Sequence, residues 1–247
     1  MKKIVFFLQN LINGGVQKSV VTLANYLIDF YDVSIILAEN NTDINYKINK
    51  KIKIYLIETK KFDLTKNNVG MEIFNYRVNA LEELLAKVEV DLVFSYEDYN
   101  NLILLSTKAL CKKAISCRNC IEEKFTLLGH IHLLDNKFYI QKIKELYYKA
   151  DLIVTVSKAI QNELSKFTYS KNIHTIYNGI SQDIPYIKPT IHNGYILNVA
   201  RLVEQKGQKD LIKAFKMIEK QITQNLIIVG EGKNKKELEM LINHLNL

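Results

Sequence analysis

Apolar residues along the chain fall into two alternating patterns. Short runs rich in β-branched and apolar residues, four to six positions long, are typical of strands buried on both faces of a parallel sheet. The longer stretches between them repeat apolar residues at three- and four-residue spacing, which is typical of amphipathic helices. The alternation therefore predicts an α/β fold, a parallel sheet with helices on both faces.

The same periodicity gives the extent of each element. In the first part of the chain, strands are predicted over Ile4–Leu8, Val33–Leu37, Ile52–Leu56, Leu92–Ser95, Lys113–Ser116, Leu152–Val156 and Ile173–Tyr177. Helices are predicted between them over Val16–Phe30, Met71–Val88, Asn100–Cys111, Asn136–Lys149 and Lys158–Phe167.

A break in the pattern separates two domains. Both prolines, Pro185 and Pro189, lie in Asn178–Asn193, a stretch with few apolar residues that is predicted to be a linker. After it come strand Tyr195–Ala200, helix Gln208–Gln221, strand Asn225–Val229 and helix Asn234–Asn246. We expect a Rossmann-like domain over residues 1–186 and the first two βα units of a second one over 187–247. Because an α/β domain usually has about 100–150 residues, the chain is expected to stop within the second.

Composition narrows the class of protein. With 48% hydrophobic and 24% charged residues among 247, the chain is neither disordered nor fibrous. The apolar start, Ile4–Leu8, is too short for a signal peptide, and no run approaches the ~20 apolar residues of a membrane span. Three cysteines without an export signal favour a reducing, cytoplasmic setting.

The net charge of +8 is concentrated in one region. Residues 101–150 carry nine basic and four acidic side chains, a local net of +5. Within it, the predicted helix Asn136–Lys149 places lysines opposite apolar residues, as in a helix with a solvated face or one that lies on an anionic membrane. No motif of a nucleic-acid-binding fold is present, so nucleic acid is not an expected partner.

Two glycine turns follow predicted strands. Gly14 and Gly15 lie between the first strand and the first helix, where backbone amides can approach an anion. Gly230 and Gly232 follow the last strand. Neither the G-x-G-x-x-G fingerprint nor the G-x-x-x-x-G-K-[ST] loop is present, which argues against a dehydrogenase and a P-loop NTPase.

A pair of cations follows the first strand of the second domain. Arg201 lies at the carboxyl end of that strand, where open α/β sheets bind ligands, and Lys206 precedes the next helix. Arginine offers a fork to phosphate oxygens and lysine a point charge, so the pair can clamp a diphosphate, although solvated surface charges at a loop are also common.

Taken in order, these segments resemble the retaining nucleotide-sugar glycosyltransferases of the GT-B fold known as glycosyltransferase family 4. The resemblance spans nearly the whole chain. Its motifs are GGVQK at 14–18, ADLIVTVS at 150–157, IYNGI at 176–180, VARLVEQKG at 199–207 and VGEG at 229–232.

The resemblance implies a set of roles. The catalytic pair Arg201 and Lys206 would hold the donor diphosphate and stabilise the leaving nucleotide without a metal or other cofactor. Gly14 and Gly15 would close on the phosphates and the sugar, and Gly230 and Gly232 would line the nucleotide pocket. Arg118 and Asn119 would contact the sugar where many relatives have histidine. The leaving phosphate would assist deprotonation of the acceptor hydroxyl, so no protein base is named.

The function expected from this resemblance is sugar transfer from a nucleotide-sugar donor to a glycan or lipid-linked acceptor in cell-surface polysaccharide or lipopolysaccharide assembly. The enzyme would be cytoplasmic, at the inner face of the cell membrane. Two alternatives remain open: an inactive truncated glycosyltransferase, and an α/β module that binds nucleotide or phosphate.

Two further groups of polar residues each allow more than one interpretation. Cys117 and Cys120 have the spacing of redox and zinc sites, but His130 and His132 are only two positions apart, so neither a metal nor a redox role is expected. Glu97-Asp98 follows a predicted strand, where it can bind acceptor or cap the next helix; capping is the preferred interpretation. His174 and His192 are predicted to be surface or linker residues.

Overall fold

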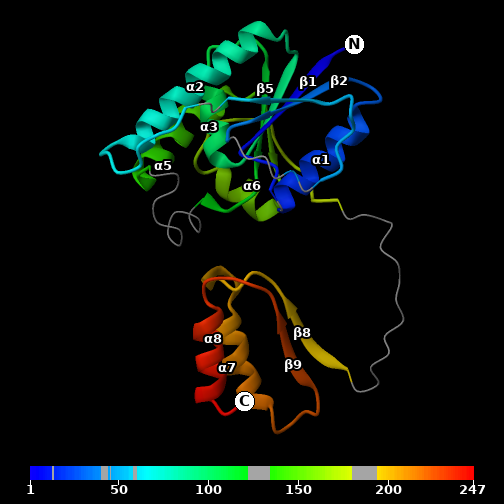
Figure 1. The fold of residues 1–247 in the computed structure, drawn as a ribbon, viewed down its shortest axis with the longest axis vertical. Helices are drawn as coiled ribbons and strands as arrows, with labels where there is room; N and C mark the ends of the chain where they lie inside the picture. Colours follow the sequence, from blue (N-terminus) through cyan, green and yellow to red (C-terminus); the bar gives the residue numbers. More distant parts are fainter. Residues whose placement is uncertain (13, 40–43, 45, 58–59, 122–133, 180–193) are drawn as a thin grey trace. The chain divides into compact units, whose positions relative to one another are not determined.

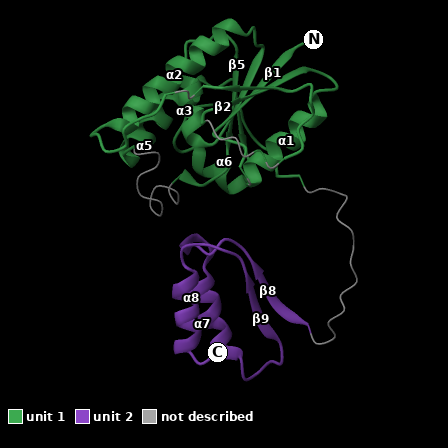
Figure 2. Cartoon of the chain, in the orientation of Figure 1, with its two compact units in different colours: residues 1–180 green, residues 181–247 purple. Residues whose placement is uncertain are grey.

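The computed structural model describes residues 1–12, 14–39, 44, 46–57, 60–121, 134–179 and 194–247. The chain divides into two compact units, residues 1–180 and 181–247 (Figure 2). The predicted domain boundary at 186 and both prolines lie outside the described residues. No helix among the described residues is long and apolar enough to cross a bilayer.

Unit 1 is built on one parallel sheet of seven strands in the order β3-β2-β1-β4-β5-β6-β7 (Figure 1). The strands are β1 (Lys3–Leu8), β2 (Asp32–Leu37), β3 (Lys53–Leu56), β4 (Leu92–Tyr96), β5 (Lys112–Cys117), β6 (Leu152–Thr155) and β7 (Ile173–Thr175). All seven predicted strands are confirmed, each within two residues of its expected ends.

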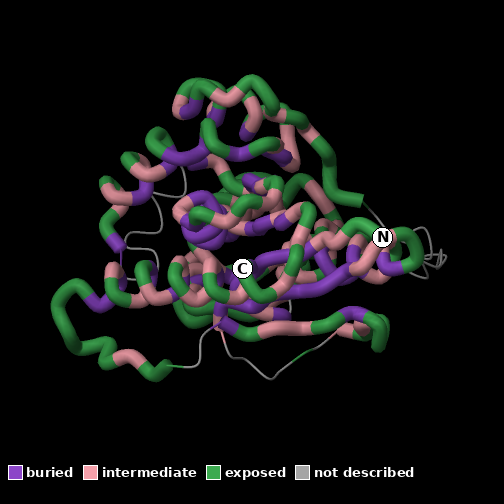
Figure 3. The backbone as a smooth tube through the Cα atoms, turned by 90° about the horizontal axis from the view of Figure 1, so that it is seen from above, coloured by how far each residue is buried: buried purple, intermediate pink, exposed green. Residues whose placement is uncertain are grey.

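Helices cover both faces of this sheet. They are α1 (Gly15–Leu27), α2 (Val69–Lys87), α3 (Asp98–Ser106), α5 (Asn136–Leu146) and α6 (Lys158–Leu164), with the short 3₁₀ helix η1 (Tyr147–Lys149) after α5. One core lies beneath α2, α3 and α5, and a second lies beneath α1. Strand β1 contributes to both: Phe7 belongs to the first core and Phe6 to the second, and both are fully buried (purple in Figure 3 marks buried positions).

Several helices differ in detail from the prediction, and α1 and α6 each end three residues early. Helix α3 ends at Ser106, five residues before the expected Cys111. In the predicted basic helix, Tyr139, Ile143 and Leu146 are buried, and Phe138 and Ile140 are partly buried against the same core.

Unit 2 contains a two-stranded parallel sheet of β8 (Tyr195–Val199) and β9 (Asn225–Val229), with helices α7 (Gln208–Ile218) and α8 (Lys235–His244) and the 3₁₀ helix η2 (Glu204–Lys206). Its buried apolar cluster is Leu202, Ile212 and Leu238. Alternate strand residues turn away from this core and are exposed, namely Tyr195, Leu197, Val199, Ile227 and Val229. Both predicted βα units are confirmed, with one apolar sheet face uncovered by the described residues.

The small core of unit 2 makes it sensitive to a single cavity. Replacing the fully buried Ile212 by alanine should cost about 2–5 kcal/mol, enough to unfold a unit with so few buried apolar side chains. Hydrogen exchange of Ile212→Ala should show lost protection in β8 and β9 and retained protection in β1 and β4. Ile218→Ala, on the half-exposed side of the same helix, is the matched control. Retained protection of β8 and β9 in Ile212→Ala would contradict this account.

Candidate functional site

The Gly14–Gly15 turn joins β1 to α1 and is held by a tyrosine distant in sequence. The Tyr46 hydroxyl accepts a hydrogen bond from the Gly14 amide at 2.8 Å and donates one to the Gly14 carbonyl at 2.9 Å. Helix α1 has no side-chain cap. A Cβ on Gly14 would meet only the end of the flexible Gln17 side chain. The turn thus presents uncapped amides of α1 from a fixed backbone.

Tyr46 is itself fixed through α1. The Asn25 amide donates to the Lys47 carbonyl, and its oxygen accepts from the Asn49 amide, each at 2.9 Å. The Tyr46 ring packs partly buried against the core beneath α1. The segment around Tyr46 and the glycine turn are therefore positioned by the same helix.

An ion pair between a buried arginine and a partly exposed carboxylate lies at the carboxyl ends of β1 and β2. Arg77 of α2, 4% exposed, contacts the Glu39 carboxylate at 3.4 Å. Glu39 also accepts hydrogen bonds from the side-chain amides of Gln9 and Asn10, which follow β1. The Arg77 guanidinium lies over the Tyr99 ring at 5.4 Å. Because a buried guanidinium needs a partner, this arrangement fixes the start of the loop that leads to Gly14.

Arg118 and Asn119 follow β5. The Arg118 guanidinium donates to the Asn178 side chain beyond β7 and lies 5.9 Å from the centre of the Tyr96 ring. Partial burial lowers the pKa of Arg118, and the neighbouring Tyr96 and Glu97 act in the opposite direction. Asn119 is exposed. The structure thus brings Arg118 together with the ends of β4 and β7, and Asn178 belongs to the IYNGI segment of the sequence.

Glu97 does not have the predicted capping role. It is the N-cap residue of α3, but its side chain makes no capping hydrogen bond. Its backbone has φ 73° and ψ 141°, a conformation that costs a residue with a side chain about 1–3 kcal/mol. The adjacent Asp98 is buried and accepts a hydrogen bond from the Tyr147 hydroxyl at 3.2 Å. The prediction that Glu97 caps this helix, made from residue type alone, is therefore wrong.

In unit 2, Arg201 and Lys206 are both exposed. Neither side chain has a hydrogen bond or ion pair to another residue that the structure describes. The backbone between them is fixed, since the buried Gln208 side chain donates to the Arg201 carbonyl at 3.0 Å and the Lys206 amide donates to the Val203 carbonyl at 2.9 Å. Two cationic side chains thus extend into solvent from a rigid turn.

Gly230 and Gly232 lie against the Arg201 segment. A Cβ on Gly230, whose φ is 158°, would clash with the Ala200 carbonyl, and one on Gly232 would clash with Leu202 backbone atoms. The Leu202 amide also donates to the Glu231 carbonyl at 2.9 Å. The segments around Arg201 and Gly230, thirty residues apart in the chain, therefore pack against each other. Neither glycine position has room for a side chain.

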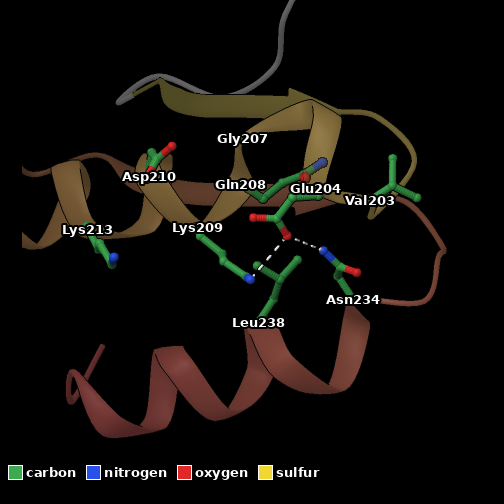
Figure 4. Close-up of a pocket in the computed structure, with 9 residues that line it drawn as sticks. All are labelled: Val203, Glu204, Gly207, Gln208, Lys209, Asp210, Lys213, Asn234 and Leu238. Atoms are coloured by element: carbon green, nitrogen blue, oxygen red, sulfur yellow. Dashed lines mark hydrogen bonds and ion pairs between the residues drawn. The ribbon is translucent and has the colours of Figure 1, made fainter. Parts of the chain in front are cut away.

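A pocket of about 180 Å³ lies beside this turn, between η2, α7 and α8 (Figure 4). The Glu204 carboxylate points into it and contacts the Lys209 ammonium and the Asn234 amide, each at 3.1 Å. Lys209 also pairs with Glu237 at 2.8 Å. Arg201 and Lys206 do not line the pocket, so its polar contacts fix η2, the turn that ends in Lys206, against both helices.

The cysteine cluster shows no metal geometry in the part of the chain that the structure describes. Cys117 is buried at the end of β5, and Cys111, Cys117 and Cys120 form no disulfide among the described residues. No group of three His, Cys, Asp or Glu side chains in the described ranges could hold a metal ion. His130, His132 and His192 lie outside those ranges. His174 is exposed on β7, and its ring contacts the Asn172 side chain at 2.9 Å.

Comparison with known families identifies both units. The model for Glycosyltransferase Family 4 matches residues 13–183, and that for Glycosyl transferases group 1 matches residues 190–247. A curated relative, the N-acetylgalactosamine-N,N'-diacetylbacillosaminyl-diphospho-undecaprenol 4-alpha-N-acetylgalactosaminyltransferase of Campylobacter jejuni, is 29% identical over 257 residues. The alignment covers all of this chain and 67% of that protein, so the chain spans about two thirds of the relative's length.

Solved structures share the fold. Sucrose-phosphate synthase of Thermosynechococcus elongatus matches with a TM-score of 0.78 at 14% identity, over all of this chain and 68% of that one. The HepE protein of Anabaena, solved with UDP and glucose, matches with a TM-score of 0.70 at 18% identity, over all of this chain and 67% of that one.

The Tyr46 contact predicts a local change in the glycine turn. Tyr46→Phe removes both hydrogen bonds to Gly14 and keeps the ring. Amide exchange at Gly14 should therefore accelerate by about 10-fold or more, because losing a hydrogen bond costs roughly 1.5 kcal/mol. Tyr31→Phe, another partly buried tyrosine against the same core, is the matched control and should leave Gly14 unchanged. Equal exchange in wild type and Tyr46→Phe would show that the contact does not hold the turn.

Proposed function

The chain belongs to Glycosyltransferase Family 4, and we propose on that basis that it serves in transfer of a sugar from a nucleotide-sugar donor to a glycan or lipid-linked acceptor in cell-surface polysaccharide assembly. The observation that carries the proposal is the exposed pair of Arg201 and Lys206 on one rigid turn, within the segment that the group 1 model matches. The named activity of the Campylobacter relative, whose acceptor is a diphospho-undecaprenol lipid, supports the acceptor class.

Arg201 and Lys206 carry the central chemical role. They bind the two phosphates of the donor, and their charges stabilise the nucleoside diphosphate as the bond from the sugar C1 to its phosphate oxygen breaks. The acceptor hydroxyl forms the new bond to C1, and its proton passes to the leaving phosphate. Positive charge for this step comes from the two side chains, so the proposed reaction requires no metal ion.

Each unit has further groups with a proposed binding role. Gly14 and Gly15 present the uncapped amides of α1 to donor phosphate and sugar oxygens. Gly230 and Gly232 keep the nucleotide-facing backbone close to the Arg201 segment. Arg118 and Asn119 bind sugar hydroxyls at the end of β5.

The proposed working location is the inner face of the cell membrane. Helix α5 and η1 expose Lys137, Lys144 and Lys149, with the half-exposed Tyr148 among them. The opposite side of α5 is anchored in the core through Tyr139 and Ile143. A cationic surface of this kind attracts anionic lipid headgroups, and a lipid-linked acceptor would be met there.

Nucleotide binding tests the donor site. In calorimetric titration with UDP, GDP and ADP sugars, at least one should saturate the chain. Arg201→Ala and Lys206→Ala should each weaken that binding by about tenfold or more, because each removes a charged contact to phosphate. Lys220→Ala, an exposed lysine of the same unit, is the control. Wild-type affinity in both variants would refute the clamp, and no binding by any donor would refute the proposed function for this chain.

Liposome sedimentation tests the membrane contact. Binding to vesicles with anionic lipid should exceed binding to neutral vesicles and should fall steeply between ~0.05 and ~0.5 M salt, since the attraction is screened. Replacing Lys137, Lys144 and Lys149 by glutamine should abolish it. Replacing Lys213, Lys220 and Lys236 of unit 2 by glutamine lowers the net charge by the same amount and should have little effect on vesicle binding. Equal binding to both vesicle types would contradict the electrostatic contact.

A further inference from the structure

Gln208 is a polar residue at a position of α7 where the periodicity favours an apolar one. The apolar face of this helix continues through Leu211, Ile212 and Phe215. Gln208 precedes them by three, four and seven positions, so it lies on the same face, and it is only 2% exposed. Because burial of an amide without a hydrogen bond is costly, the Gln208 side chain must make a contact that an apolar side chain could not.

That contact is with the backbone of Arg201. The Gln208 side-chain amide donates to the Arg201 carbonyl at 3.0 Å. The same carbonyl accepts from the Val203 amide, also at 3.0 Å. The carbonyl is thus held by two donors, one in its own turn and one on the first residue of α7.

The contact closes the loop that carries both cations of the proposed clamp. Lys206 lies between the two ends of the loop, and its amide donates to the Val203 carbonyl at 2.9 Å. Gly207, with φ 66°, then turns the chain into α7. The Gln208 side chain spans the loop from α7 back to Arg201, so it fixes the backbone of Arg201 relative to that of Lys206.

The direction of the Arg201 side chain depends on this backbone. The side chain is exposed, and no other side chain in the described ranges orients it by a hydrogen bond or an ion pair. A guanidinium fork binds phosphate oxygens only when it is aligned with them, so a shift of its backbone weakens the contact. A buried residue that holds the Arg201 carbonyl can therefore affect phosphate binding without touching phosphate.

We propose that Gln208 is a positioning residue for donor binding: its hydrogen bond to the Arg201 carbonyl holds the Arg201 guanidinium where it and Lys206 contact the same diphosphate. The inference rests on the proposed function and adds to it a residue that acts through Arg201. A role in stability alone would be met by an apolar side chain, which the rest of this helix face has.

Two apolar replacements test the side-chain amide. Gln208→Met and Gln208→Leu keep a similar volume and remove the hydrogen bond, and the Arg201 carbonyl retains its Val203 donor. Both should keep the hydrogen-exchange protection of β8 and β9 and should weaken diphosphate binding by about threefold to tenfold. Leu211→Met, a swap of similar volume one turn further along α7, is the matched control and should leave binding unchanged.

The experiment is a calorimetric titration of the full chain with UDP, GDP and ADP, repeated for a double-mutant cycle with Arg201→Ala. If Gln208 acts through Arg201, Gln208→Met should weaken binding by less than about twofold once the Arg201 side chain is gone. Three results overturn the proposal: an equal loss in both backgrounds, wild-type binding in both Gln208 variants, or lost protection of β8 and β9 in both variants.

The wild-type titration distinguishes failure of this role from failure of the proposed function. If the wild-type chain binds one of the three nucleotides and both Gln208 variants bind it equally well, only the role of Gln208 is contradicted. If the wild-type chain binds none of them, the proposed function is contradicted and the role of Gln208 with it. A loss of affinity that disappears in the Arg201→Ala background is the result that a purely structural residue does not produce.

Discussion

Parallel pairing of β1 with β2 on one side and β4 on the other is the constraint from which the arrangement of unit 1 follows. A strand hydrogen-bonded along both edges and covered on both faces favours apolar side chains, and Phe6, Phe7 and Leu8 of β1 are fully buried. Polar residues become frequent where the hydrogen-bonded pairing of the strands ends. The polar residues Gln9, Glu97 and Arg118 directly follow the carboxyl ends of β1, β4 and β5.

A buried arginine near the carboxyl ends of β1 and β2 requires a partner of opposite charge. The charge of Arg77 is almost entirely removed from water and needs an opposite charge beside it, which Glu39 provides. The Glu39 carboxylate also accepts hydrogen bonds from the side-chain amides of Gln9 and Asn10. Tyr46 then fixes Gly14 a few residues further on. Contacts from α2, from the end of β2 and from the segment after it converge on the same loop, so its backbone is determined by residues that need never touch a ligand.

The sequence was informative where local periodicity determines structure and uninformative where distant segments meet. All nine strands were predicted because buried strands leave short apolar runs between turn residues. The contacts of Tyr46 with Gly14 and of Arg77 with Glu39 join residues more than thirty positions apart, and neither leaves a local pattern. At Glu97 the residue type favoured a cap, but the backbone there has φ 73° and the side chain makes no capping hydrogen bond.

The exposed apolar face of the sheet in unit 2 affects how copies of this chain associate in solution. Five exposed apolar side chains, together with strand edges of β8 and β9 that no other described strand pairs with, form a template for edge-to-edge self-association. Residues 187–247 carry ten basic and six acidic groups, and like-charge repulsion between copies opposes that association. Since salt screens repulsion and leaves apolar contact intact, concentrated solutions of this chain should be most stable at low ionic strength.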